Sequence, residues 1–199
     1  MNWTVYLLAL WLVLGLELSL KPALALGPTA IAPSLVLPLV IFVAMHAPSV
    51  AALWAAAVAG LLLDLTFPLA LTTGGEVRVP GPSALGFTLA SALTLNLRAM
   101  LIKRNPLTLL AMSIAGAIVA AIVVVALLTI RATYGDPIAF RPAPQLGARL
   151  LSSLYTGVAA LLQALILFPM ATLFGFTSHH AGHRRFTTCL LYTSPSPRD

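Results

Sequence analysis

Few residues in this chain could do chemistry, and the most informative of them is Asp64. It follows the apolar run of residues 58–63 and lies four residues before Pro68, which we expect to end the helix. A charge inside a bilayer costs about 2.5–3.5 kcal/mol on insertion scales, so it persists where it has a partner or a wet cavity. We predict a structural role for Asp64, with Arg78, Arg98 or backbone N–H groups as partners. A direct contact with another protein and a proton or solute route are the alternatives.

Enzymatic chemistry has little support in the sequence. An aspartic intramembrane peptidase needs two acids at one site, and Asp64 is alone at depth, with Asp136 in a loop and Glu17 near a helix end. The His-Glu-x-x-His motif of zinc peptidases is absent. The run Gly81-Pro82-Ser83-Ala84 differs from the Gly-x-Ser-Gly of rhomboid proteases at its fourth position, and no His lies inside a span to act as a base. We therefore predict a protein that is not an enzyme and needs no cofactor.

A cluster of histidines follows the last apolar segment. His179, His180 and His183 are spaced three and four residues apart, so two of them share a face if the helix continues. A metal site at such a pair lacks a nearby carboxylate or Cys ligand. We interpret these residues as polar side chains at a membrane exit and predict no metal site.

The composition defines the class of protein. Of 199 residues, 60% are hydrophobic and only 8% are charged, which is too few to coat a water-soluble fold. Several apolar runs approach the 20 or so residues that cross a bilayer as a helix. The formal charge of +6 is scattered among loops, with no basic face, so we predict contact with anionic lipid and no nucleic-acid binding. The sequence predicts an all-α, polytopic membrane bundle.

We expect one transmembrane domain over residues 1–178, followed by a tail over 179–199. The six predicted spans are 3–20, 29–45, 48–66, 83–102, 106–130 and 146–174. The second span contains Pro33 and Pro38, so it should be kinked, broken or partly re-entrant. Small residues at helix-contact spacing predict that the third and fifth spans pack inside the bundle; they are Ala52, Ala56, Gly60, Gly116, Ala117, Ala120 and Ala121.

The predicted orientation depends on one basic turn. Arg98, Lys103 and Arg104 lie between the fourth and fifth spans and favour the cytoplasmic side. With six spans, both termini are then cytoplasmic, although the Lys and Arg counts of the two sides are nearly level. The residues from 187 onward, above all Leu190 to Asp199, resemble translated sequencing-adapter read-through, so we expect them to be artefactual and exclude them from functional reasoning.

One part of the chain resembles a known family. Gly60-Leu61-Leu62-Leu63-Asp64, the loop-to-helix segment from Gly81 to Phe87, and a span that ends in Arg98 and Lys103-Arg104 are similar to the rod shape-determining MreD family. The segment Ile31-Ala32-Pro33-Ser34 also resembles the Pro-containing second span of that family. The inserted residues 74–78 and the long segment 131–144 depart from the family pattern.

The resemblance implies a non-enzymatic scaffold of the cell-elongation machinery in the bacterial inner membrane. It implies an MreC-like protein, the MreB filament and the peptidoglycan synthase as partners. Gly60, Asp64, Gly86 and the basic turn carry over as structural or interaction positions.

The strongest rival is the substrate-binding membrane subunit of an energy-coupling-factor vitamin transporter, which has a similar six-helix fold. Such a protein needs polar and aromatic groups that converge on a pocket. The candidates Trp54, Asn96, Tyr155 and Gln163 are spread over different spans. The apparent lack of a polar pocket favours the scaffold.

Overall fold

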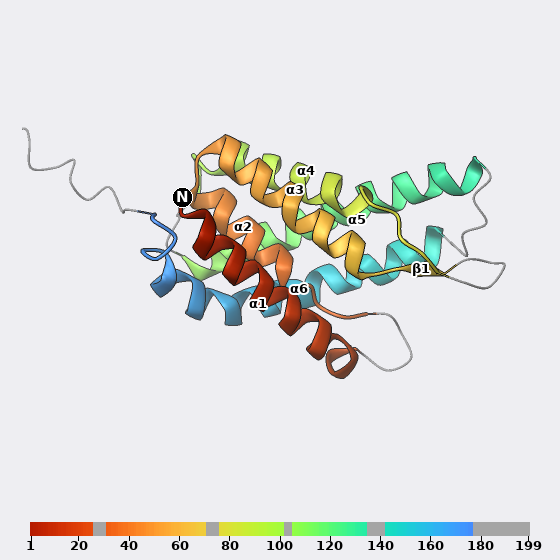
Figure 1. Cartoon of the computed structure of the whole chain (residues 1–199), viewed down its shortest axis with the longest axis horizontal. Coiled ribbons are helices and arrows are strands. Elements are labelled where there is room, and N and C mark those ends of the chain that lie inside the picture. Colours follow the sequence, from red (N-terminus) through yellow and green to blue (C-terminus); the bar gives the residue numbers. More distant parts are fainter. Residues whose placement is uncertain (26–30, 71–75, 102–104, 135–141, 177–199) are drawn as a thin grey trace, which may run out of the picture.

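The computed structural model describes residues 1–25, 31–70, 76–101, 105–134 and 142–176, which form six helices (Figure 1). These are α1 (Trp3–Leu24), α2 (Val36–His46), α3 (Ser49–Thr66), α4 (Pro82–Leu97), α5 (Pro106–Thr133) and α6 (Pro142–Met170). Between α3 and α4, the two-residue strands β1 (Leu69–Ala70) and β2 (Glu76–Val77) pair antiparallel. The fold is the all-α bundle that the composition predicts.

Four helices are long and apolar enough to cross a membrane, namely α1, α3, α5 and the part of α6 from Ala143 onward. Large apolar side chains on their outer faces are exposed, among them Trp11 at 74%, Trp54 at 64% and Leu165 at 73%. Such exposure is unfavourable in water but suits a surface that faces lipid. The protein is therefore a helical membrane protein.

The second and fourth predicted spans are shorter as helices than the sequence analysis expected. The helix in the predicted span 29–45 begins at Val36 and has 11 residues, about 16 Å of rise, against a hydrocarbon core of about 30 Å. Pro33 precedes α2, and Pro38 lies in its first turn, where a missing N–H costs no helical bond. The helix in the predicted span 83–102 has 16 residues and ends at Leu97. Neither α2 nor α4 reaches the roughly 20 residues of a complete span.

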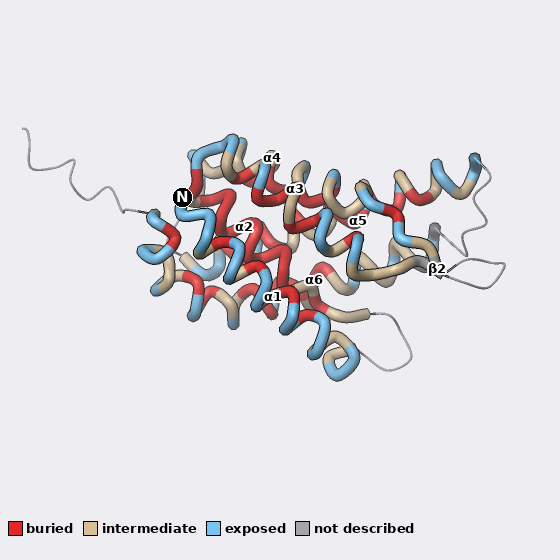
Figure 2. Tube along the Cα trace, in the orientation of Figure 1, coloured by how far each residue is buried: buried red, intermediate tan, exposed pale blue. Residues whose placement is uncertain are grey.

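The short helix α2 is the centre of the bundle. Every residue from Val36 to Met45 is buried, and α2 contacts all five other helices (Figure 2). A helix that is apolar on all sides is stable where neighbours surround it completely. The remaining helices therefore form a sheath around α2, with α4 between α3 and α5, and α6 against α5.

Close contacts between helices occur at the predicted small residues of α3 and α5, but α2, and not α3 or α5, is the helix that lies inside the bundle. Ala52, Ala56 and Ala120 are at most 6% exposed. A Cβ on Gly116 of α5 would lie 2.9 Å from Cδ1 of Ile41 in α2. These backbones approach closely because no larger side chain separates them.

Helices α1 to α6 run alternately up and down, so their ends gather at two poles. At one pole, the Asn2 N–H donates a 2.9 Å hydrogen bond to the carbonyl of Phe174, just after α6, and Arg98 ends α4. At the other pole lie the two-stranded sheet, the start of α4 and the start of α6 (Figure 1). The cytoplasmic orientation of the Arg98 pole stays a prediction.

Candidate functional site

Asp64 caps the start of α4. Its Oδ2 accepts hydrogen bonds from the backbone N–H groups of Gly81 at 2.9 Å, Ser83 at 3.0 Å and Ala84 at 3.3 Å. The first N–H groups of a helix have no partner inside it, and the helix dipole favours a negative charge there. The glycine at the cap has φ of +126°, which side-chain-bearing residues rarely adopt. Backbone N–H groups, one of the predicted kinds of partner, therefore bind Asp64, and its structural role stays a prediction that this capping geometry fits.

Gly60 allows the cap to form, because it lies one helical turn before Asp64 on α3. A Cβ at this position would be 2.5 Å from both Cα of Ala84 and the carbonyl oxygen of Ser83. Helix α3 therefore approaches the backbone of α4 at a distance that only glycine permits. Gly86 repeats the arrangement on the other side of α4, where a Cβ would lie 3.2 Å from Cα of Ala120 in α5. The start of α4 is thus fixed between α3 and α5.

The other predicted site residues lie apart from this cap. Pro68 directly follows Phe67, the residue that ends α3, as predicted. Arg98 lies at the far end of α4, where its Nη1 donates a 2.9 Å hydrogen bond to the carbonyl of Ala47. It joins α4 to the α2–α3 turn and is not a partner of Asp64. Lys103 and Arg104 lie outside the described residues, so the basic turn stays a prediction.

A second buried acid, Glu17, was missed by the sequence analysis, which placed it near a helix end and treated Asp64 as alone at depth. Glu17 is 2% exposed, and its Oε2 accepts bonds from the N–H groups of Leu35 and Val36, both at 2.9 Å. The hydroxyl of Ser34 donates a third bond at 3.3 Å. Glu17 therefore caps α2 as Asp64 caps α4. Glu17 is buried because α2 begins later in the chain than predicted, so that its first turn lies inside the bundle beside α1.

A sequence pattern marks both of these acid-capped helix starts. Each acid lies near the end of a long apolar helix, and each is followed by a Pro-Ser pair just before or at the start of a shorter helix: Pro33-Ser34 and Pro82-Ser83. Short or Pro-interrupted segments in corresponding positions are typical of membrane folds that hold a site at the ends of broken helices.

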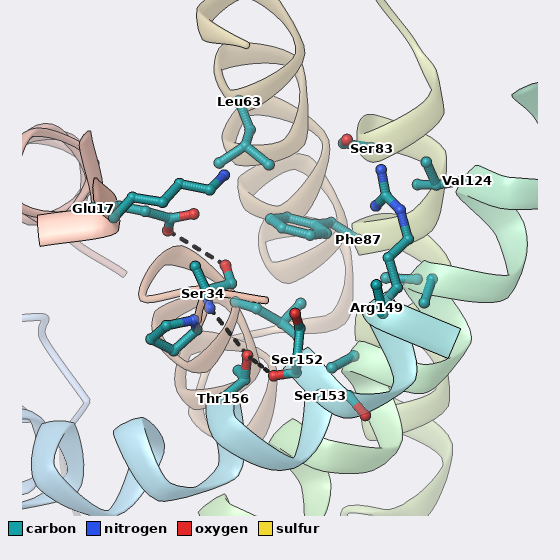
Figure 3. A pocket seen from close by; sticks show the side chains of 18 of the residues that line it. Glu17, Ser34, Leu63, Ser83, Phe87, Val124, Arg149, Ser152, Ser153 and Thr156 are labelled. Carbon is teal, nitrogen blue, oxygen red and sulfur yellow. Dashed lines mark hydrogen bonds between the residues drawn. The ribbon is translucent and has the colours of Figure 1, made fainter. Parts of the chain in front are cut away.

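A cavity of about 400 Å³ lies between the two capped helix starts (Figure 3). Its wall combines Glu17 and Lys21 of α1, Ser34 before α2, and Ser83 and Phe87 of α4. Helix α6 adds Gln145, Arg149, Ser152, Ser153 and Thr156. This cavity, with its mixed polar and apolar lining, was not foreseen from the sequence. The polar and aromatic candidates named from the sequence do not line this cavity; they are Trp54, Asn96, Tyr155 and Gln163.

Hydrogen bonds hold the wall together on the α6 side. The backbone N–H of Ser34 donates a 3.0 Å bond to Oγ1 of Thr156, whose hydroxyl donates to the carbonyl of Ser152. Nε2 of Gln163 donates a 2.9 Å bond to the carbonyl of Leu35. The segment before α2 is thus tied to α1 by Glu17 and to α6 by Thr156 and Gln163. Hydrogen bonds thus link the α1, α2 and α6 sides of the wall, whereas Ala117, Ala121 and Val124 make its α5 side apolar.

The cavity contains two cations as well as the acids. Arg149 reaches from α6 toward Ser83 at the start of α4 and interacts electrostatically with Asp64 (Figure 3). Lys21 interacts electrostatically with Glu17, and its Nζ lies 3.6 Å from the ring centroid of Phe67. Arg78 and Arg98, the cations suggested by the sequence, do not line the cavity.

Among the described residues, no group of three metal-ligating side chains converges. The histidines at 179, 180 and 183 lie outside those residues.

Comparison with known proteins gives no family for this chain: no family model matches it, and neither does any curated protein or solved structure.

Proposed function

We propose that the protein is a non-enzymatic scaffold of the cell-elongation machinery, similar to the MreD family. The observation that carries the proposal is that the residues of the resemblance form one packed junction. Gly60 contacts Ser83 and Ala84, Asp64 caps the same segment, and Gly86 joins it to α5. A motif whose two parts lie 17 positions apart in the sequence and yet build one packed junction fits a protein that presents a fixed helix surface to partners.

The hydrogen bonds of Glu17 and Asp64 support a role without catalysis. Both carboxylates accept several backbone N–H bonds, so their oxygens are engaged with the starts of α2 and α4. Asp64 and Glu17 therefore serve to fix helix starts.

The partners in this proposal are an MreC-like protein, the MreB filament and the peptidoglycan synthase, in the bacterial inner membrane. The long helices offer wide apolar outer faces on which transmembrane helices of partners can pack. In this proposal the pole of Arg98 faces the cytoplasm, where the filament lies.

The proposal is tested by co-purification. The tagged chain is expressed with the MreC-like protein of the same genome, extracted in mild detergent and recovered through its tag. We expect the MreC-like protein to be retained, and to be lost with Gly60→Ala, which disturbs the junction. Gly15→Ala is the matched control, because a Cβ at Gly15 meets nothing within 4 Å. Failure of the folded wild-type chain to retain the MreC-like protein would refute the proposal.

The cavity favours a second candidate, the substrate-binding membrane subunit of a vitamin transporter. A pocket of this volume, lined by polar groups from several helices, is typical of small-molecule sites. If this candidate is right, the protein should co-purify with an ATPase-containing transport module, and addition of the vitamin should raise its thermal stability. Retention of the MreC-like protein without such a module decides for the scaffold.

A further inference from the structure

The cavity wall carries two cationic side chains whose donors are unused. Within the described residues, neither the Lys21 ammonium nor the Arg149 guanidinium forms a hydrogen bond. Both side chains are half-buried and line the cavity, so their charges are partly desolvated. Arginine and lysine donors in a partly desolvated site form strong charge-assisted bonds when an anion arrives.

The nearby carboxylates do not neutralise these two cations completely, because backbone N–H groups also bind the carboxylates. Glu17 is compensated by the N–H groups that begin α2, and Asp64 by those that begin α4. Each helix start also contributes about half a positive charge. The formal charges of the two cations and the two carboxylates cancel. The two helix starts then leave the region around the cavity positive by roughly one unit. The field in the cavity therefore favours an anion.

Two hydroxyl groups on the wall are also available. Among the described residues, the hydroxyls of Ser83 and Ser152 have no hydrogen-bond partner, whereas Ser153 and Thr156 donate to carbonyl groups of their own helix. Ser83 and Arg149 approach each other from α4 and α6 (Figure 3). Two cations with two hydroxyls match a group that has several oxygens and a charge of one to two, which describes phosphate better than a single carboxylate.

We propose that this cavity binds a phosphate group, held by Arg149 and Lys21 and oriented by the hydroxyls of Ser83 and Ser152. The volume of about 400 Å³ also accommodates a glycerol-sized or sugar-sized substituent. The phosphate can belong to a lipid headgroup or to a soluble ester. The inference does not depend on the scaffold proposal, since retention of an MreC-like protein neither requires nor excludes a bound phosphate.

The experiment uses the full chain, purified in detergent, with two probe pairs that differ by a phosphate group. Native mass spectrometry compares phosphatidic acid with diacylglycerol, and calorimetry compares glycerol 3-phosphate with glycerol. We expect a phosphate-bearing probe to bind and its phosphate-free counterpart not to bind. Comparable affinity for phosphatidic acid and glycerol 3-phosphate identifies a soluble ester as the source, and preference for phosphatidic acid identifies a lipid.

Variants then locate the binding. Arg149→Gln should weaken binding about tenfold or more, because it removes a charge-assisted pair. Arg78→Gln is the matched control, since Arg78 is exposed and lies outside the cavity wall, and it should bind like the wild type. The double variant Ser83→Ala with Ser152→Ala provides a second test that leaves both charges in place, and it should also weaken binding. Absence of binding in both probe pairs, or wild-type affinity in the folded Arg149→Gln and double-serine variants, would overturn the proposal.

Discussion

Replacing Gly60 by alanine is the sharpest test of the junction between α3 and α4. In an open helix, Gly→Ala is favourable by about 0.5–1 kcal/mol, because alanine loses less backbone entropy. At Gly60 the new methyl group meets the α4 backbone, at 2.5 Å from both Cα of Ala84 and the oxygen of Ser83. Apolar carbons pack at about 3.5 Å or more, so the helices must separate by about 1 Å.

The cost of this separation has two parts. Overpacking at a rigid contact costs about 1–3 kcal/mol. The Asp64 bonds to Ser83 and Ala84 are 3.0 and 3.3 Å long and lengthen with the same movement, which weakens bonds worth about 1.5–3 kcal/mol each when charged. Set against the helix-propensity gain, we expect a net loss of about 2–4 kcal/mol in the free energy of unfolding.

The assay is reversible unfolding of the purified chain in mixed micelles with increasing sodium dodecyl sulfate, followed by circular dichroism. Gly15→Ala is the control, because the space around that position is empty and the substitution should be neutral or slightly stabilising. If Gly60→Ala unfolds at the same detergent fraction as the wild type, the close approach of α3 to α4 is wrong.

Three further predictions concern the caps and the orientation. Asp64→Ala should destabilise by about 2–4 kcal/mol and Asp64→Asn by less, since the amide keeps one acceptor oxygen; equal unfolding of both variants and the wild type contradicts the cap. Glu17→Ala should cost at least as much, because it strands two N–H groups in the bundle core, and amide exchange at the start of α2 should accelerate. In a chain in which Cys189 is replaced, cysteines introduced in place of Arg78 and Asn105 should react with an impermeant thiol reagent from opposite sides of the membrane, the one at position 78 from outside. Labelling of both from the same side contradicts the predicted topology.

The sequence predicted the all-α bundle, and four of the six helix starts to within one residue, for a simple reason. Long apolar stretches bounded by Pro and Gly leave little choice of structure in a bilayer, so α3 and α5 begin within a residue of their predicted starts. The need of Asp64 for a partner was also predictable, because an acid at the end of an apolar run requires one nearby.

Other features depend on contacts between distant segments. The short length of α2 results from its central position, where the other helices bury it on all sides, and hydropathy alone does not distinguish this from a complete span. Glu17 was overlooked because its partners, Leu35 and Val36, are identified only once the start of α2 is known. The cavity was missed for the same reason, since Lys21 and Arg149 lie on helices far apart in the sequence.

The most direct test of the proposed scaffold role is depletion of the protein in the organism that encodes it, with cell shape and the incorporation of fluorescent D-amino acids into the wall as readouts. The account predicts that rod-shaped cells round up and that wall labelling along the cell cylinder declines, and that the wild-type gene restores both while Gly60→Ala restores neither. Cells that keep their rod shape and labelling pattern after the protein is gone would contradict the account.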